Sequence, residues 1–280
     1  MRGAPGPVKG TPVPRALADR DEDALFEFAA ALPPCHLHLR RAAEISGPTA
    51  FLGAFAGSRL AAIAHVGVPG SAVVAGEPEA LRALGASPAA ARAPWRVLVG
   101  RAGDTEAWLL GEACRIPHLA RTHPYLRLDA PPTPAAPAVA VERAGVGDLS
   151  ALVALAERFQ EDEVPAGAQR LARADLATRA RALVSQGASF VVREAGVPVV
   201  RVDVPIACEE GALLAGIVTD PAHRRRGLAR AALASLCARL LSAGSRCVML
   251  HVAEENAPAR ALYAALGFSE IDRLRVAYAR

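Results

Sequence analysis

The strongest architectural signal in this sequence is a proline-rich segment at residues 129–137, DAPPTPAAP. Proline at this density favours an extended, semi-rigid spacer over a helix or a central strand. The segment divides the 280 residues into two parts of similar size, and a chain of this length has a prior of about two domains at roughly 150 residues each. We therefore expect a disordered leader at residues 1–14, a domain over 15–128, a linker over 129–137 and a second domain over 138–280.

Both parts show apolar patterns in a similar order. In the first part the patterns predict helices over 16–32, 77–84 and 105–112, a hairpin over 50–66 with its turn at Gly57, and strands over 72–75, 95–100 and near Leu126. In the second they predict strands over 138–142, 211–219, 247–253 and 267–279, a hairpin over 189–204 with its turn at Gly196, and helices over 146–164, 168–186, 226–241 and 258–266. Hairpins followed by a strand-helix-strand unit predict an α/β (α+β) fold, with a mixed, mostly antiparallel sheet flanked by helices. The repeated order suggests that this fold occurs twice.

The scarcity of lysine excludes several kinds of chemistry. Lys9 is the only lysine among 32 basic residues, and it lies in the Gly/Pro-rich leader. A Schiff-base lysine, or the lysine of a GxxxxGK[ST] phosphate loop, needs a place in a folded region. The other charges are spread evenly, since 14 basic and 12 acidic residues stand up to position 137, and 18 and 16 after it. With only 4% aromatic residues as well, we expect no nucleic-acid partner.

Membrane, secretory and metal-binding features are equally weak. Mean hydropathy is +0.23, but no apolar stretch reaches the roughly 20 residues of a membrane span, and the leader has no apolar signal segment. The five cysteines are odd in number and form no CxxC pair: Cys35, Cys114, Cys208, Cys237 and Cys247. His36 and His38 would share one face of a strand, but two imidazoles without a third ligand are expected to be structural. We expect a cytoplasmic protein with reduced thiols, no metal and no membrane partner.

The segment that carries chemistry is IVTDPAHRRRGLA, residues 217–229. A strand ends at Thr219, Pro221 stops it, and Gly227 opens a helix whose first amides have no partner within the helix. The Arg-x-x-Gly-x-Ala spacing from Arg224 to Ala229 would place these amides around a phosphate. The alternative is a solvated basic helix start, which is what a run of charges alone usually is.

Two motifs give this segment a specific resemblance. Val218, Pro221, Arg224, Gly227 and Ala229 stand as in motif A of the GCN5-related N-acetyltransferases. The segment HVAEENAPARALYAALGF, residues 251–268, resembles their motif B, and together the two motifs cover about residues 138–280. The whole chain resembles the two-domain subgroup, in which a degenerate acetyltransferase-like domain of unknown function comes first.

The resemblance implies acetyl-CoA as acyl donor and assigns residues to its binding. These are Ile217, Val218, Thr219, Arg224, Arg225, Arg226, Gly227, Leu228, Ala229, Asn256 and Tyr263. Backbone N–H groups of Ile217 and Thr219 would bind pantetheine and polarise the acetyl carbonyl, and Tyr263 would protonate the departing thiolate. The alternatives are a core aromatic for Tyr263 and a helix cap for Asn256.

The general base is less clear, because many relatives place a glutamate on the strand equivalent to residues 211–219 and this strand has no acid. The best replacement is Glu161, Asp162 and Glu163 at the end of a helix, where acids oppose the macrodipole. They could hold a cationic amine, with Glu163 as the base, or they could be a hydrated loop. His251 is a second candidate for substrate binding and for the base, although a lone strand histidine is more often structural.

The first half lacks the phosphate-binding spacing, and Glu77 and Glu79 would repel a pyrophosphate from the helix that follows residues 72–75. We expect it to be a scaffold that shapes the substrate cleft or mediates self-association, which leaves a homodimer open. The prediction for the protein is an acetyl-CoA-dependent N-acetyltransferase that transfers acetyl directly to a primary amine, of a small molecule or a peptide, in a ternary complex. The alternative is a catalytically silent sensor of acyl-CoA or an interaction module.

Overall fold

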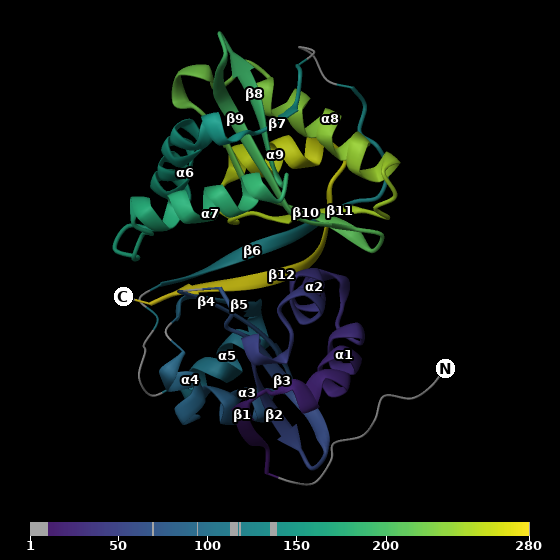
Figure 1. Cartoon of the computed structure of the whole chain (residues 1–280), viewed down its shortest axis with the longest axis vertical. Coiled ribbons are helices and arrows are strands. Elements are labelled where there is room, and N and C mark those ends of the chain that lie inside the picture. The colour runs from purple at the N-terminus through teal and green to yellow at the C-terminus, as the bar shows by residue number, and fades with distance from the viewer. Residues whose placement is uncertain are drawn as a thin grey trace. The chain divides into compact units, whose positions relative to one another are not determined.

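The computed structural model describes residues 11–68, 70–93, 95–112, 117, 119–134 and 139–279 (Figure 1). Lys9, Cys114 and residues 1–10 of the expected leader lie outside the described residues. By packing, the chain forms two compact units, one up to Thr122 together with the residues from Arg273 on, and one from His123 to Asp272. These units differ from the expected domain boundaries, because residues 123–128 group with the second unit and the last residues with the first. None of the described helices is long and apolar enough to cross a membrane.

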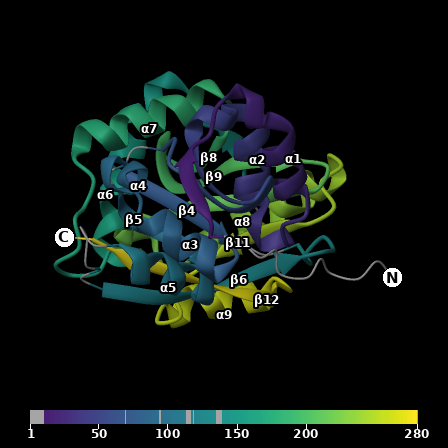
Figure 2. The same cartoon turned by 90° about the horizontal axis from the view of Figure 1, so that it is seen from below.

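The first unit is built on a sheet with the strand order β1-β2-β3-β4-β5-β12. Its elements are β1 (Val13–Ala16), α1 (Glu22–Ala30), α2 (Leu37–Ser46), β2 (Phe51–Ala56), β3 (Arg59–His65), β4 (Gly70–Gly76), α3 (Pro78–Gly85), α4 (Pro88–Arg92), β5 (Trp95–Arg101) and α5 (Ala102–Gly111). Only β4 and β5 pair in parallel among these described strands. Helices α1 and α2 pack into one apolar core and α3, α4 and α5 into another (Figure 2).

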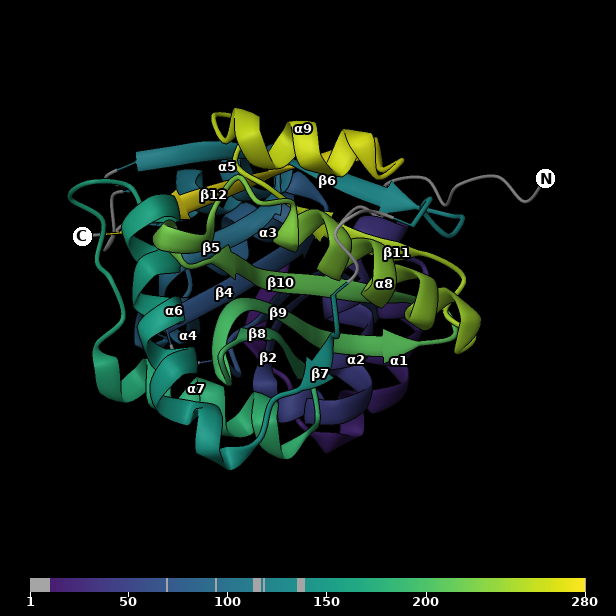
Figure 3. The ribbon, with the colours of Figure 1, turned by 90° about the horizontal axis from the view of Figure 1, so that it is seen from above.

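The second unit repeats this plan with the strand order β6-β11-β10-β9-β8-β7. Its elements are β6 (Leu119–Leu128), β7 (Glu142–Arg143), α6 (Leu149–Glu163), α7 (Arg173–Ser185), β8 (Ser189–Glu194), β9 (Val197–Cys208), β10 (Gly211–Thr219), α8 (Leu228–Ser242), β11 (Val248–His251) and α9 (Ala257–Ala265). The one parallel pair described is β10 with β11. Helices α8 and α9 pack on one face of the strands, and α6 and α7 pack on the other (Figure 3).

Each unit is completed by a strand that follows the last helix of the other. Strand β6 comes after α5 of the first unit, but its residues from Tyr125 to Leu128 pair with β11. Strand β12 (Ser269–Tyr278) comes after α9 of the second unit, but its residues from Leu274 to Tyr278 pair with β5. The mixed, mostly antiparallel α/β fold and its duplication are therefore confirmed, whereas the exchange of strands was not predicted.

Several predicted elements need correction. Residues 16–18 are not helical, and Asp19–Asp21 form a 3-10 turn before α1. Asp21 holds this turn by accepting from Arg15 at 2.5 and 2.6 Å and from the Ala18 N–H at 2.9 Å. The leader was predicted too long, since β1 begins at Val13 and pairs with β2. His36 and His38 do not share a strand: a 3-10 turn ends at His36, and His38 lies in α2.

Other boundaries also differ. Helix α7 begins at Arg173 rather than at position 168, and the short helix α4 was not predicted at all. The predicted strand over 138–142 corresponds to β7, only Glu142–Arg143, and Ala138 is outside the described residues. Helix α4 begins at Pro88, and proline is favoured at the first position of a helix because its missing N–H would have no partner there.

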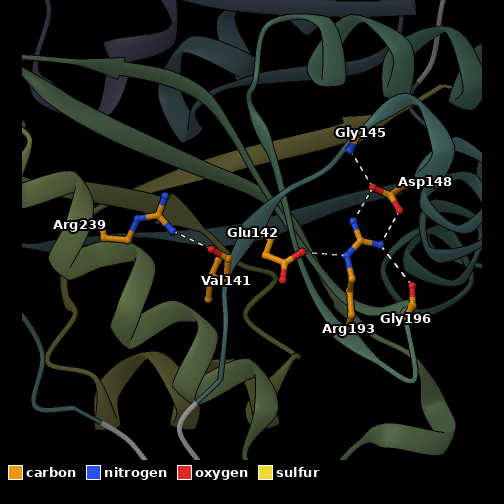
Figure 4. Close-up of polar contacts among 7 residues, drawn as sticks. All are labelled: Val141, Glu142, Gly145, Asp148, Arg193, Gly196 and Arg239. Carbon is orange, nitrogen blue, oxygen red and sulfur yellow. Dashed lines mark hydrogen bonds and ion pairs between the residues drawn. The ribbon is translucent and has the colours of Figure 1, made fainter.

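Arginine side chains fix the edge of the second unit (Figure 4). The Arg193 guanidinium donates to both carboxylate oxygens of Asp148, at 2.6 and 2.7 Å, and to Glu142 at 3.0 Å. This pairing holds the pKa of the Asp148 carboxyl below its usual range. Arg239 of α8 donates to the Val141 carbonyl at 2.8 Å. The start of α6 is thereby fixed to β7 and β8.

Candidate active site

The two parallel strands of the second unit stay paired over only part of their length. Strand β10 pairs with β11 only at Ala212 and Leu213, although β10 continues to Thr219 and β11 to His251. On its other side β10 stays paired with β9 up to Thr219. Beyond Leu213 one edge of β10 therefore has no described strand partner. Backbone N–H and C=O groups on such an edge must be satisfied by something other than the ladder, and a ligand can do this.

A bulge lies in β10 at the same place. Ala215 is opposite Asp203 and Val218 is opposite Arg201, so three steps along β10 match two steps along β9. Gly216 within the bulge has a φ of +56°, a left-handed conformation that glycine adopts at little cost. A bulge breaks the ladder and turns the backbone locally. It therefore changes the direction of the Ile217 backbone next to the unpaired edge.

The loop after β10 leads into a helix start that no described side chain caps. Gly227 is the N-cap of α8 with a φ of +76°, and the first bond within the helix joins the Ala231 N–H to the Gly227 carbonyl at 3.0 Å. The amides from Leu228 to Arg230 thus have no partner within the helix. Arg225 has a positive φ of 59°, which is unusual for a residue with a side chain. Uncapped helix amides and the helix dipole together suit a phosphate group.

The arginines of this loop are exposed and held by weak ion pairs. Arg224 donates to the Thr219 carbonyl at 3.0 Å and pairs with Asp162 at 2.6 Å. Arg226 pairs with Glu194 at 2.7 Å, and Arg225 has no ion-pair partner in the part of the chain that the structure describes. Exposed pairs of this kind contribute about 0–1 kcal/mol. A phosphate, which carries more charge, can therefore displace the carboxylates.

Tyr263 lies on α9 with only 5% of its surface exposed, and its ring meets Phe268 edge-on at 5.9 Å. Burial raises the pKa of its phenol, and the negative charge of Glu163 raises that pKa further, with a smaller contribution from Cys237. The phenol is therefore protonated at neutral pH.

Asn256 connects the start of α9 with the end of α6. Its Oδ1 accepts from the Ala259 N–H at 3.0 Å, which caps α9, and its Nδ2 donates to Oε1 of Glu163. The structure thus shows the helix cap that was one of the two interpretations of Asn256. The same side chain holds the carboxylate at the C-terminal end of α6.

The other two acids of the predicted cluster have different partners. Glu161 pairs with Arg158 at 2.6 Å, and Asp162 pairs with Arg224 of the loop after β10. Glu161 and Asp162 are exposed, whereas Glu163 is half-buried. The structure therefore joins Glu163 to Asn256 at the start of the helix that carries Tyr263, and separately joins Asp162 to Arg224 of the predicted phosphate site.

His251 ends β11, where this strand has already left β10, and its Nδ1 lies 3.0 Å from Nδ1 of His123 on β6. One of these nitrogens must carry a proton and the other must accept it. Tyr125 stacks on the His251 ring at 6.5 Å. His123 and Tyr125 are not predicted from the sequence, because they precede the proline-rich segment and become neighbours of β11 only through the exchange of strands.

The corresponding place in the first unit is closed. Strands β4 and β5 pair up to Val73 and Val99, and a Cβ added to Gly100 would lie 2.9 Å from both Cγ2 and the carbonyl oxygen of Val74. Glu77, at the N-cap of α3, pairs with Arg59 at 2.7 Å. The described part of this unit therefore offers neither an opening between parallel strands nor a basic helix start. Across the described residues of both units, no group of three or more His, Cys, Asp or Glu side chains is placed to hold a metal ion.

Comparison by sequence identifies the second unit. Residues 152–268 match the family model of the acetyltransferase (GNAT) family, a stretch that runs from α6 through α9 to Phe268. This matched stretch lies entirely within the second unit. No curated protein matches the chain.

Solved structures of GNAT proteins share the fold of nearly the whole chain. A GCN5-related N-acetyltransferase from Sphaerobacter thermophilus has a TM-score of 0.62 at 17% identity, covering 97% of this chain and 96% of that one. A GNAT-family acetyltransferase from Colwellia psychrerythraea has a TM-score of 0.59 at 12% identity, covering 96% and 100%. A tandem GNAT protein from the clavulanic acid biosynthesis pathway has a TM-score of 0.58 at 17% identity, covering 95% and 98%. At these identities the similarity shows the fold alone.

Proposed function

We propose that this protein is an acetyl-CoA-dependent N-acetyltransferase that transfers acetyl directly to a primary amine in a ternary complex. The observation that carries the proposal is the early end of the pairing between β10 and β11. It lies beside the β10 bulge and is followed by the uncapped start of α8, all within the stretch that matches the GNAT family model. The acceptor we propose is a small molecule or a peptide with a cationic amine. The setting we propose is cytoplasmic.

The residues present suit acetyl-CoA. The uncapped amides of Leu228 and Ala229, with the exposed Arg224 to Arg226, match the charge of a pyrophosphate. The unpaired edge of β10 supplies backbone groups for the amides of pantetheine, in this proposal at Ile217 and Thr219. Bound acetyl-CoA supplies the acetyl group as an activated thioester.

Glu163 is the proposed proton acceptor. An amine attacks only when neutral, so an ammonium group must first lose a proton to a base within reach. Asn256 holds one oxygen of the Glu163 carboxylate at the end of α6. The exposed Glu161 and Asp162 attract a cationic substrate to this end of the helix.

Tyr263 is the proposed hydrogen-bond donor to the departing sulfur. Its raised pKa keeps the phenol protonated, but it also makes the phenol a weak acid toward a thiolate, whose conjugate thiol has a pKa of about 8.5 in cysteine. Part of that rise comes from the charge of Glu163. When Glu163 takes a proton from the amine, this charge disappears and the pKa of Tyr263 falls. The phenol therefore becomes a better acid after the amine has lost its proton.

His251 is a second candidate for the base, favoured by its hydrogen bond with His123. An imidazole titrates closer to neutral pH than a carboxyl group, which suits a base that must accept a proton at neutral pH. Glu163→Gln and His251→Gln distinguish the two, because only the variant of the true base loses turnover while keeping coenzyme A affinity.

The test is to incubate the protein with acetyl-CoA and a panel of amines, and to follow release of free thiol. We expect Tyr263→Phe to lower kcat by about 10²-fold or more with little change in coenzyme A affinity. Tyr278→Phe, at a buried tyrosine of the first unit, is the matched control and should keep full turnover. Binding without turnover on any amine supports the silent acyl-CoA sensor instead, and failure to bind acetyl-CoA overturns both functions.

A further inference from the structure

A buried ion pair lies on β9, opposite the β10 bulge. Arg201 and Asp203 are two residues apart on the strand and are only 5% and 4% exposed. The Arg201 guanidinium donates to both carboxylate oxygens, from Nε at 3.0 Å and from Nη2 at 2.7 Å. This two-bond geometry fixes the relative orientation of the two side chains.

Two further elements hold the same pair. Arg201 Nη1 donates to the Leu152 carbonyl of α6 at 2.9 Å, and the fully buried Ser189 of β8 donates its hydroxyl to Asp203 Oδ1 at 2.7 Å. Each nitrogen of the guanidinium therefore has an acceptor. The ion pair ties together β8, β9 and the helix α6 that ends at Glu163.

The carboxylate also touches the bulge. A Cβ added to Gly216 would lie 2.6 Å from Asp203 Oδ2, and the two next-nearest atoms, at 3.4 and 3.9 Å, also belong to Asp203. The residues flanking the bulge, Ala215 and Val218, are the register partners of Asp203 and Arg201. The extra residue of β10 is thus fitted against this ion pair.

Stability does not explain the pair. Replacing a buried ion pair by apolar side chains of similar volume is often neutral or stabilising, because desolvation of both charges is avoided. Its location next to the bulge points to a role in geometry. We propose that Arg201 and Asp203 are positioning residues that hold the β10 bulge so that the backbone amides of Ile217 and Thr219 face coenzyme A. This inference rests on the proposed function.

The test compares two variants in which an ion pair is made apolar. In Arg201→Met/Asp203→Val the pair at the bulge is removed. In Arg15→Met/Asp21→Val a similar two-bond Arg–Asp pair of the first unit is removed, far along the chain from the bulge. We measure the Kd for coenzyme A by calorimetry, the midpoint of urea unfolding, and the backbone amide resonances of residues 216–219 in the unliganded protein.

We expect the Arg201→Met/Asp203→Val variant to unfold at a urea concentration no lower than the wild type, to bind coenzyme A about tenfold or more weakly, and to shift the amide resonances of residues 216–219. The control variant should keep the wild-type Kd and resonances. An unchanged Kd and unchanged resonances in the first variant overturn the proposal. If that variant does not fold, Ser189→Ala removes only the hydroxyl on Asp203, and an unchanged Kd then overturns the proposal.

Coenzyme A binding by the wild-type protein distinguishes failure of this inference from failure of the proposed function. If the wild-type protein does not bind coenzyme A, the proposed function falls. The amide resonances of the variant then still decide whether the ion pair holds the bulge, because they are recorded without a ligand.

Discussion

His65 of β3 is a buried imidazole whose protonation should destabilise the first unit. Only 4% of it is exposed, its Nε2 has no partner in the described structure, and its Nδ1 lies 3.1 Å from Nε2 of His38. Burial lowers its pKa from 6.5 to about 4, with a smaller contribution from the charge of His38. In the unfolded chain the same group should titrate near its ordinary value of about 6.5.

The sign and size of the pH effect on stability follow from the folded and unfolded pKa values of His65. Because the folded pKa lies below the unfolded pKa, the unfolded chain binds more protons, and stability falls as pH drops from about 6.5 to about 4. A difference of about 2.5 pKa units corresponds to about 3 kcal/mol, of which about 2 kcal/mol is lost by about pH 5. This is a large part of the 5–15 kcal/mol that stabilises most domains.

The assay is urea unfolding followed by tryptophan fluorescence at about pH 7.5 and about pH 5. Both tryptophans of the chain, Trp95 and Trp108, are buried in the first unit, so the signal reports on that unit. His65→Leu should lose about 2 kcal/mol less than the wild type between these two pH values. His223→Gln, at a half-buried histidine of the second unit, should lose as much as the wild type. Equal pH dependence in His65→Leu and the wild type refutes the reasoning.

Removing residues 273–280 takes from β5 its partner strand, whose residues 274 and 276–278 are buried. The free energy of unfolding of the first unit should fall by roughly 5 kcal/mol or more, and the tryptophan fluorescence should be that of unfolded protein. A native fluorescence spectrum contradicts this prediction. Gly227→Ala forces a side chain into a φ of +76°, which should cost about 1–2 kcal/mol and weaken coenzyme A binding in calorimetry, and wild-type affinity contradicts the proposed phosphate site. Burial raises the pKa of Cys237 to about 12. Iodoacetamide at neutral pH should therefore label the half-buried Cys208 before Cys237, as followed by mass spectrometry, and earlier labelling of Cys237 contradicts its burial.

Local patterns predicted the elements of the fold better than their partners. The hairpins at Gly57 and Gly196 and the helix after Gly227 follow from glycine in turns and from apolar periodicity, which depend on neighbouring residues. The pairing of β6 with β11 depends on residues more than 100 positions apart, and no local pattern records it. For the same reason the proline-rich segment predicts a domain boundary at residues 129–137, although the compact units divide between Thr122 and His123.

The candidate site was predictable where a motif has fixed spacing. The residues from Arg224 to Ala229 and the positions of Asn256 and Tyr263 were named from sequence, and the structure places Asn256 against Glu163. The ion pair of Arg201 and Asp203 was not predicted, although the sequence contains a signal for it. Two charges at alternating positions in the apolar strand VVRVDV must be buried on the same face of the sheet.

The two units share one order of strands and differ where the chemistry is proposed. A fold of this kind has one pair of parallel strands, and whether the pair stays joined decides whether backbone groups are available to a ligand. In the first unit the close contact of Gly100 with Val74 keeps β4 and β5 together, whereas in the second unit the pairing of β10 and β11 ends at Leu213. Basic residues placed at the start of α3 would therefore attract a phosphate without giving pantetheine a place to bind. The proposed activity depends on backbone geometry first and on the arginine motif second.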